Sequence, residues 1–262
     1  NLLEGLEPEE AISAMLSVKG LETGEGLENQ YIVMVTKRGV IKRTALAEFV
    51  MQRRGGKIAL SLDDDDELVF AALTHGNSDV MIAMRDGKAV RFREDTVREM
   101  GRTARGVKGV SLAEGDSVAG ACIVENDPAW MAAHQLLTIT EKGFGKRTAP
   151  DLFETKGRGG KGMICHNITE RTGRLCGIAV VDDDCDILLI TDDGTMIRTP
   201  ADGISTFGRA ASGVIVMRVA EGSSIANFAV TGKAKEEEAD ADTETETEEA
   251  EAGNSNDTDT EE

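Results

Sequence analysis

The chain contains one unit four times, and this repeat constrains its fold more than any other feature. Each copy has a short apolar segment, a tight turn ending in glycine, and an arginine four residues after that glycine. The turn glycines are Gly39, Gly87, Gly143 and Gly194, spaced 48, 56 and 51 residues apart. Repeats of about 50 residues are typical of proteins whose similar units bury their faces against one another, as in propellers and solenoids.

The repeated arginine lies on the predicted strand that follows each turn. The four equivalent residues are Arg43, Arg91, Arg147 and Arg198, and lysine precedes the first and third of them, at Lys42 and Lys146. Successive side chains of a strand point to opposite faces. One cation of each lysine–arginine pair is therefore expected to face outward.

A glycine-rich basic loop follows each of these strands, at a similar place in every repeat. The four loops read QRRGGKI from Gln52, MGRTARG from Met100, KGRGGKG from Lys156 and FGRAASG from Phe207. Glycine lets the backbone approach a ligand closely, and backbone N–H groups and cationic side chains both bind phosphate. Four such loops in register predict a surface that follows a polyanion. The candidate cations in or beside the loops are Arg53, Arg54, Lys57, Arg102, Arg105, Lys108, Lys156, Arg158, Lys161 and Arg209.

The segments between these motifs are short, rich in β-branched residues and bounded by Gly and Asp turns, which predicts an all-β chain. After each loop comes an apolar segment, an acidic turn and a second apolar segment. Short helical turns are expected only around Ala11–Leu16 and Pro128–His134. The start of the chain, over 1–20, resembles the second half of a repeat, so we expect residues 1–30 to be the end of a truncated preceding unit. The four repeats then cover residues 31–78, 79–134, 135–185 and 186–232.

The net charge of −19 is unevenly distributed along the chain. Residues 236–262 hold 14 acidic residues and no Lys or Arg, so residues 1–235 carry a charge of only −5. A segment of Glu, Asp, Thr and Ala cannot bury enough apolar surface to fold, and we predict a disordered acidic tail over 233–262. Such a tail either competes with nucleic acid for the basic loops or only aids solubility.

Other functional classes find little support in the sequence. The four cysteines form no CxxC pair, which is typical of a reduced cytosolic protein. The acidic runs at 63–66 and 182–184 lack the pattern of a calcium loop and read as solvated turns. The three histidines have no ligand spacing, no catalytic set is indicated, and no segment has the length of a membrane span.

Three tracts closely resemble the C-terminal domain of the bacterial DNA gyrase A subunit: IKRTALAEF from Ile41, VRFREDTVREMGRTARGVKGV from Val90, and GKRTAPDLFETKGRGGKG from Gly145. The resemblance extends over essentially all of residues 1–230. It implies a β-pinwheel, a propeller-like disc of six four-stranded blades with duplex DNA wrapped around its basic outer edge. In that family, wrapping presents a neighbouring DNA segment with a fixed crossing sign, so strand passage introduces negative supercoils.

The resemblance also indicates which blades are present. Residues 52–57 match six positions of the family's glutamine-and-arginine signature box, and Ile58 replaces its final glycine. The flanking tracts align this box with the third blade rather than the first. The chain is therefore expected to hold about four to five of the six blades, with the last one, which has Ser212 in its loop, binding DNA least.

The same resemblance implies partners and cofactors. The expected partners are double-stranded DNA, the remainder of the gyrase A subunit, which forms a homodimer, and the gyrase B subunit. The protein is expected to be cytoplasmic and nucleoid-associated, with no membrane partner. ATP and magnesium act in the holoenzyme, and the cleaving tyrosine belongs to the N-terminal part of the A subunit. No cofactor and no catalytic residue are expected in this segment.

Three alternatives remain open from the sequence. The nearest is the C-terminal domain of the topoisomerase IV A subunit, from a relative that decatenates DNA. A propeller that binds only proteins is more distant, because there are no Trp-Asp blade endings and Trp130 is the only tryptophan. A free-standing enzyme is disfavoured because no catalytic constellation is visible.

Overall fold

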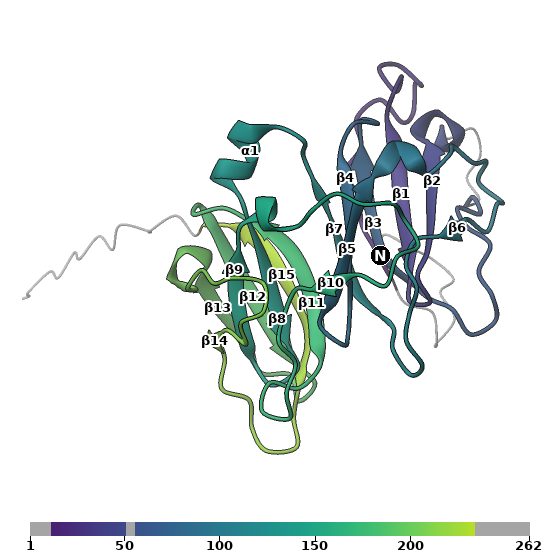
Figure 1. Cartoon of the computed structure of the whole chain (residues 1–262). Helices are drawn as coiled ribbons and strands as arrows, with labels where there is room; N and C mark the ends of the chain where they lie inside the picture. Colours follow the sequence, from purple (N-terminus) through teal and green to yellow (C-terminus); the bar gives the residue numbers. More distant parts are fainter. Residues whose placement is uncertain (1–11, 51–55, 234–262) are drawn as a thin grey trace, which may run out of the picture.

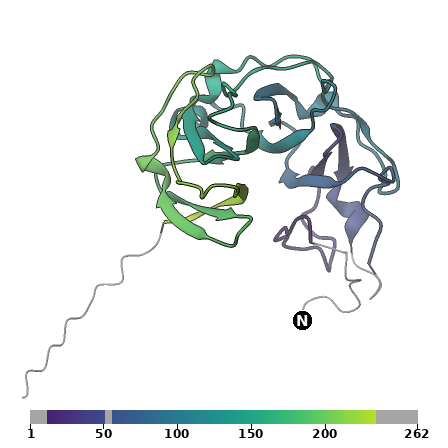
Figure 2. The same ribbon diagram turned by 90° about the horizontal axis from the view of Figure 1, so that it is seen from below.

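The computed structural model describes residues 12–50 and 56–233, and these residues form four small antiparallel sheets with very little helix (Figure 1). The sheets follow one another around an arc that is open on one side (Figure 2). The predicted all-β, propeller-like class is confirmed.

In the described ranges, three sheets have four strands and the last has three. The first sheet has the order β3 (Leu68–Thr74), β1 (Tyr31–Thr36), β2 (Val40–Ala45), β6 (Val107–Lys108). The second is β10 (Met163–Ile164), β5 (Lys88–Arg93), β4 (Asp79–Met84), β7 (Val118–Val124). The third is β11 (Leu175–Val181), β8 (Gln135–Thr140), β9 (Phe144–Thr148), β14 (Val214–Ile215), and the fourth is β13 (Met196–Pro200), β12 (Cys185–Thr191), β15 (Ile225–Gly232).

Each complete sheet takes its outermost strand from the next repeat. β6 pairs with β2, β10 with β5, and β14 with β9, each over two residue pairs. The contiguous repeats in the sequence did not predict this exchange. It links each blade to its successor, because the basic loop of one repeat leads directly into the outer strand of the blade before it.

The turn glycine receives this incoming strand. The carbonyl oxygen of Gly87 accepts hydrogen bonds from the amides of Cys165 (2.8 Å) and His166 (3.1 Å), and Gly39 and Gly143 accept equivalent pairs. All four turn glycines have a φ between 76° and 87°, a region that L side chains rarely adopt. The glycine is thus required both by the turn and by the close passage of the next repeat.

The core lies between neighbouring sheets as three apolar clusters. Strand β4 shows how one strand serves two of them. Its residues Val80 and Ile82 pack toward the first sheet, whereas Met81 and Ala83 pack toward the third. Because both faces are covered, all six residues of β4 are buried, as expected for a strand in a central layer.

The inner strands β3, β7, β11 and β15 contact one another in sequence, which places β6, β10 and β14 on the convex side of the arc. The one α-helix among the described residues, α1 (Pro128–Ala133), begins where the sequence predicted a helical turn, and Asp127 caps it. The other expected helical turn is wrong, since residues 12–18 have no regular structure and lie against the first sheet. Short 3-10 helices follow β2, β5, β9 and β13, at Leu46–Phe49, Glu94–Thr96, Pro150–Leu152 and Ala201–Gly203.

Candidate nucleic-acid interface

The strand arginine of the second repeat lies inside the protein. The side chain of Arg91 is 5% exposed, and its Nε donates to Asp79 Oδ2 at 2.7 Å. Its Nη1 donates to the carbonyl oxygens of Pro150 (2.9 Å) and Phe153 (3.2 Å), which belong to the next repeat. Arg91 is therefore a clamp between repeats, and we remove it from the predicted DNA contacts.

The third and fourth strand arginines are bound in the same way. Arg147 donates to the carbonyls of Ile204 (2.6 Å) and Asp202 (3.2 Å) and to the Asp183 carboxylate (2.6 Å), and its side chain is only 12% exposed. Arg198 donates to Asp186 Oδ2 at 2.7 Å and is 42% exposed. Only Arg198 of this pair keeps a surface that a phosphate could reach.

The first strand arginine has an aromatic partner instead. The guanidinium carbon of Arg43 lies 4.5 Å from the centre of the Tyr31 ring, a cation–π contact. Relative to Arg43, Tyr31 occupies the sequence position that Asp79 occupies relative to Arg91. Both repeats therefore supply a partner for their own arginine, and Arg43 is partly exposed.

The two lysines next to these arginines are fully buried. Lys42 Nζ donates to the carbonyls of Ala59 (2.7 Å) and Arg102, and Lys146 Nζ donates to those of Gly208 (2.6 Å) and Arg209 (2.7 Å). Desolvation lowers the pKa of each lysine to about 8, with nearby arginine charges acting in the same direction. The expectation that one cation of each pair faces outward is met in the first pair by the partly exposed Arg43, whereas in the second pair Lys146 is buried and Arg147 is only 12% exposed. Lys42 and Lys146 leave the contact set as well.

The loop arginines keep exposed surface while binding the outer strands. Three of them donate Nη1 to a backbone carbonyl of the preceding outer segment at 3.0–3.3 Å. The pairs are Arg102 with Ile58, Arg158 with Lys108, and Arg209 with Ile164. Arg158 is exposed and the other two are half-buried, so each guanidinium has further N–H groups available for a phosphate.

The other loop cations differ in their exposure and in whether a protein group already binds them. Lys108 and Lys161 are exposed and form no ion pair among the described residues. Arg105 pairs with Asp63, and Lys156 pairs with Glu154 at 3.1 Å, all four being exposed. Exposed pairs of this kind are weak and exchange readily for another anion. Lys57 is half-buried and donates to the Val50 carbonyl at 2.5 Å. Arg53 and Arg54 lie outside the described residues.

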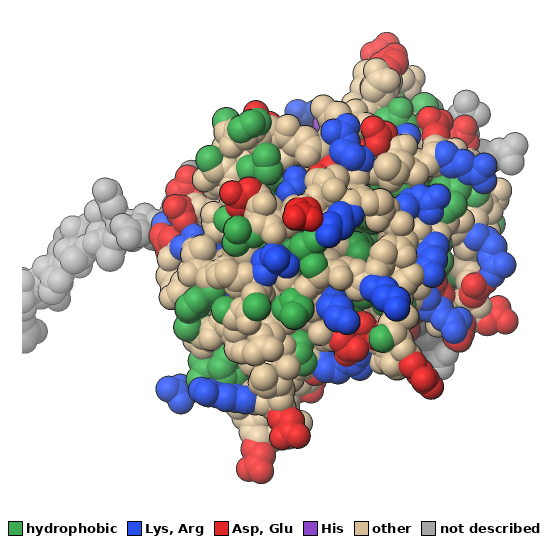
Figure 3. Space-filling view, viewed as in Figure 1, with side chains coloured by type: hydrophobic (Ala, Val, Ile, Leu, Met, Phe, Trp, Pro, Cys, Tyr) green, Lys and Arg blue, Asp and Glu red, His purple; other side chains and the backbone are tan. Residues whose placement is uncertain are grey.

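The convex side of the molecule carries these cations together. Figure 3 shows Lys and Arg side chains gathered over the region of β6 and β10, while acidic side chains mark the tips of the lower turns. Exposed Lys88, which the sequence did not predict, pairs with Ile164 of β10, also belongs to this surface and forms no ion pair within the described part of the chain. Its position is not cationic in the other repeats, so the repeat register could not select it. We call the exposed and half-exposed cations of this side the basic rim.

A buried histidine holds the last basic loop in place. His166 Nε2 donates to the Ser212 carbonyl at 3.0 Å, and Nδ1 accepts from the Thr138 hydroxyl at 3.0 Å. Burial, together with the charge of Lys146, lowers the pKa of His166 to about 4. The imidazole is therefore neutral at pH 7.

Burial also raises the pKa of the Cys122 and Cys165 thiols to about 12, so they remain protonated.

Residues 12–50 and 56–233 offer no support for two other kinds of site. No group of three or more His, Cys, Asp or Glu side chains is arranged to hold a metal ion. No helix in these ranges has the length and apolarity required to cross a bilayer.

Comparison with known proteins identifies the family. The model of the DNA gyrase C-terminal domain, a beta-propeller family, matches residues 30–75, 79–124, 134–182 and 186–231. The chain is 40% identical over 224 residues to the DNA gyrase A subunit of Staphylococcus epidermidis, and 44% identical over 225 residues to that of Salmonella typhimurium. Each alignment covers 86% of this chain and 24% of the relative, so the chain spans about a quarter of the length of these proteins.

Two solved structures share the fold. The C-terminal domain of DNA topoisomerase IV gives a TM-score of 0.72 at 25% identity, covering 79% of this chain and 64% of that one. The DNA gyrase A C-terminal domain gives 0.68 at 26% identity, covering 79% and 67%. The repeats, the four sheets and the matched residues agree, and the chain belongs to the DNA gyrase C-terminal domain family of beta-propellers.

Proposed function

We propose that this chain binds duplex DNA along the basic rim and bends it around the convex side of the arc. The observation that carries the proposal is the series of cations with free N–H groups that runs across successive blades on one side of the molecule: Arg102, Lys108, Arg158, Lys161 and Arg209. Contacts to phosphate position DNA without reading its sequence. No described helix is long enough to read a groove, so we expect little sequence preference.

Bending the duplex has an energetic cost that several blades must offset together. A smooth bend of 40–90° over 20–30 base pairs costs about 1–6 kcal/mol. The arc presents the rim in successive short steps, one for each outer strand, so that a bent duplex meets more cations than a straight one. The loop of the last repeat, which leads into β14 at the edge of the third sheet, has Ala210 to Ser212 where the loop before it has Gly159 to Lys161. It is therefore expected to contribute least.

We further propose that the chain acts within the gyrase A subunit, because the relatives that cover most of it carry that name. In that setting the bend would present a neighbouring DNA segment with a fixed crossing sign, so that strand passage by an ATP-dependent type II topoisomerase introduces negative supercoils. The partners would be the rest of the homodimeric A subunit, together with the B subunit, in the bacterial cytoplasm at the nucleoid. ATP and magnesium would act elsewhere in that complex, and this segment would contribute no catalytic residue.

The corresponding domain of topoisomerase IV is the second candidate, because the solved domain of that protein gives the higher TM-score of the two structures described. The two roles differ in whether the DNA becomes wrapped. A relaxed plasmid closed by a nicking-closing enzyme in the presence of this chain should retain supercoils of one sign if the chain wraps DNA. Binding without retained supercoils would favour the topoisomerase IV role.

Duplex binding against salt concentration tests the proposed function directly. We expect log K to fall linearly with log salt, with a slope of about −0.9 for each phosphate contacted. The same measurement on residues 1–235 tests the proposed competition by the acidic tail, which predicts tighter binding without it. If neither form binds a 40-base-pair duplex at 50 mM salt, the proposed function is wrong.

A further inference from the structure

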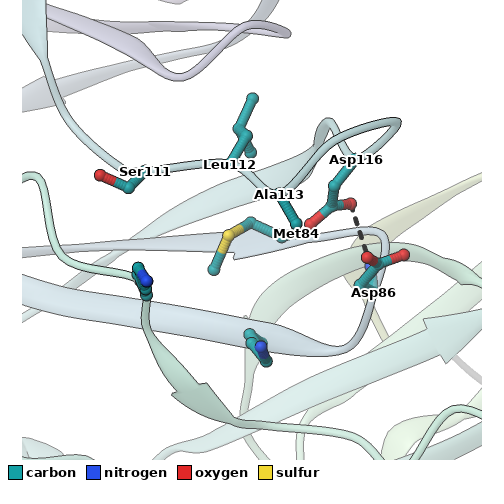
Figure 4. Close-up of a pocket in the computed structure, with 8 residues that line it drawn as sticks. Met84, Asp86, Ser111, Leu112, Ala113 and Asp116 are labelled. Carbon is teal, nitrogen blue, oxygen red and sulfur yellow. Dashed lines mark hydrogen bonds between the residues drawn. The ribbon is translucent and has the colours of Figure 1, made fainter.

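We propose that one pocket on the basic rim, between Lys88 and Lys161, binds a single phosphate of the DNA backbone, which the two lysines share; we call it the shared seat. This inference rests on the proposed function and names a contact point for it. The pocket has a volume of about 310 Å³ and is lined by the two lysines together with Met84, Ser111, Leu112, Ala113, Asp86 and Asp116. Figure 4 shows Asp86 and Asp116 side by side at one end, Ser111 at the other, and Met84 between them.

The loop that carries Lys161 is fixed on both sides. On one side, the Ser111 amide donates to the Gly160 carbonyl (2.9 Å) and the Ser111 hydroxyl to the Gly159 carbonyl (2.7 Å). On the other side, Gly162 has a φ of 76°, and a Cβ there would lie 2.8 Å from the carbonyl oxygen of Ala89. The backbone on either side of Lys161 is thus held against two earlier segments, which places its side chain in the same pocket as that of Lys88.

The charges around the pocket leave the two lysines available. Asp116 Oδ1 accepts from Arg174 Nη2 (3.2 Å) and from the amides of residues 86 and 117, and its side chain is 2% exposed. Asp86 also binds Arg174, at 2.9 Å. One guanidinium therefore compensates part of the acidic end. Lys88 and Lys161 have no ion pair among the described residues, so both ammonium groups are available to an anion in the pocket.

The pocket is a property of this blade and not of the repeat. The residue equivalent to Lys88, directly after the turn glycine, is Val40, Phe144 or Thr195 in the other repeats. Residues equivalent to Lys161 are cationic in two of the other three repeats. Only the second sheet therefore brings two lysines to one hollow. A phosphate group suits it because a single anion can accept from both ammonium groups, and each charge-assisted bond is stronger than a neutral one.

A double-mutant cycle tests the shared seat. The variants are Lys88→Gln, Lys161→Gln and the double variant in the full 262-residue chain, with affinity for a 40-base-pair duplex measured from 50 to 200 mM salt. Removing one phosphate contact should make the slope of log K against log salt shallower by about 0.9, which corresponds to a loss of affinity of about eightfold at 0.1 M salt. If the lysines share one phosphate, the double variant loses about eightfold in total. Two independent contacts would instead multiply to about 60-fold.

Lys142→Gln is the matched control, because Lys142 is an exposed lysine that does not line this pocket and whose Nζ donates to the Glu170 carbonyl. Its affinity and slope should equal those of the unmodified chain. Additive losses, or affinities unchanged in both single variants and the double variant, would overturn the shared seat while leaving the proposed function intact. Failure of the unmodified chain to bind duplex would overturn both.

Discussion

Replacing Gly87 with alanine tests whether a turn glycine is needed to receive the strand of the next repeat. Gly194 supplies the control, since its φ is 87° and that of Gly87 is 78°. In this left-handed region an L-residue costs about 1–2 kcal/mol. The surroundings differ. A Cβ on Gly87 would overlap the carbonyl oxygen of His166 and lie 2.5 Å from Ile168 Cγ1, whereas among the described residues nothing lies within 4 Å of a Cβ on Gly194.

The difference between the two variants can be estimated from these contacts. Gly194→Ala should lose only the backbone term, about 1 kcal/mol of the free energy of unfolding. Gly87→Ala must also push β10 away, which weakens the two amide bonds to the Gly87 carbonyl at about 1 kcal/mol each. We therefore expect a gap of about 2 kcal/mol. For a protein of this size that corresponds to a melting temperature lower by about 4–8 °C.

Urea unfolding followed by the fluorescence of Trp130 is the appropriate assay. Trp130 is the only tryptophan, and it packs against the cluster that contains Cys165, directly after β10. Both variants should unfold with the slope of the unmodified chain, and Gly87→Ala should have the lower midpoint. Equal loss of stability in the two variants would show that the turn conformation alone requires glycine, and that strand donation does not depend on it.

Three other perturbations have expected outcomes, each measured by urea unfolding. His166 has a pKa of about 4 in the folded protein and an ordinary value of 6.5, so the unfolded state binds more protons between these two values. The free energy of unfolding should therefore fall by about 3 kcal/mol as the pH drops from 6.5 to 4. The variant His166→Asn should lack this pH dependence. Lys42 has a folded pKa of about 8 and an ordinary value of 10.5, so the stability of the unmodified chain relative to Lys42→Met should rise between pH 8 and pH 10.5, and a flat difference would contradict the burial of its charge. Arg91→Gln leaves the buried carboxylate of Asp79 with one more distant cation, the half-exposed Arg93 at 3.9 Å, and should cost about 3 kcal/mol. The duplex affinity of the folded protein should stay unchanged, and a loss of affinity with normal stability would return Arg91 to the DNA contacts.

The repeat was sufficient to predict the class of fold, but not how the blades are joined. Apolar segments with Gly and Asp turns at a regular period predict stacked β units, and four sheets are present. The segment after each basic loop is apolar too, but it pairs only briefly, through Val107 and Lys108 in the first sheet. An apolar pattern indicates that a segment is buried, but it does not indicate which sheet the segment packs against. Strand exchange between repeats therefore has no signature in the pattern.

A recurring residue does not state the cause of its recurrence, which explains why Lys42, Arg91 and Lys146 were predicted to contact DNA although they are buried. A cation that recurs at one position of every repeat indicates a shared requirement, and either a ligand or the fold can impose it. For the strand arginine the sequence held a clue, because Asp79 and Asp186 precede Arg91 and Arg198 by the same interval. Pairing of the two strands brings each carboxylate to its guanidinium. A recurring charge with a recurring opposite charge favours the fold.

A bound polyanion imposes a weaker requirement on each repeat than the fold does. Affinity for DNA depends on how many phosphates are contacted along the rim, and a cation can supply a contact from any exposed position of a blade. Lys88 illustrates this freedom, since it is exposed, lies beside Lys161, and has no cationic equivalent in the other three repeats. Register across repeats therefore selects residues of both kinds, the buried clamp Arg91 as well as the exposed loop residue Arg158. A cation available to DNA keeps exposed surface and N–H groups that no internal partner uses, and only the three-dimensional structure identifies such residues.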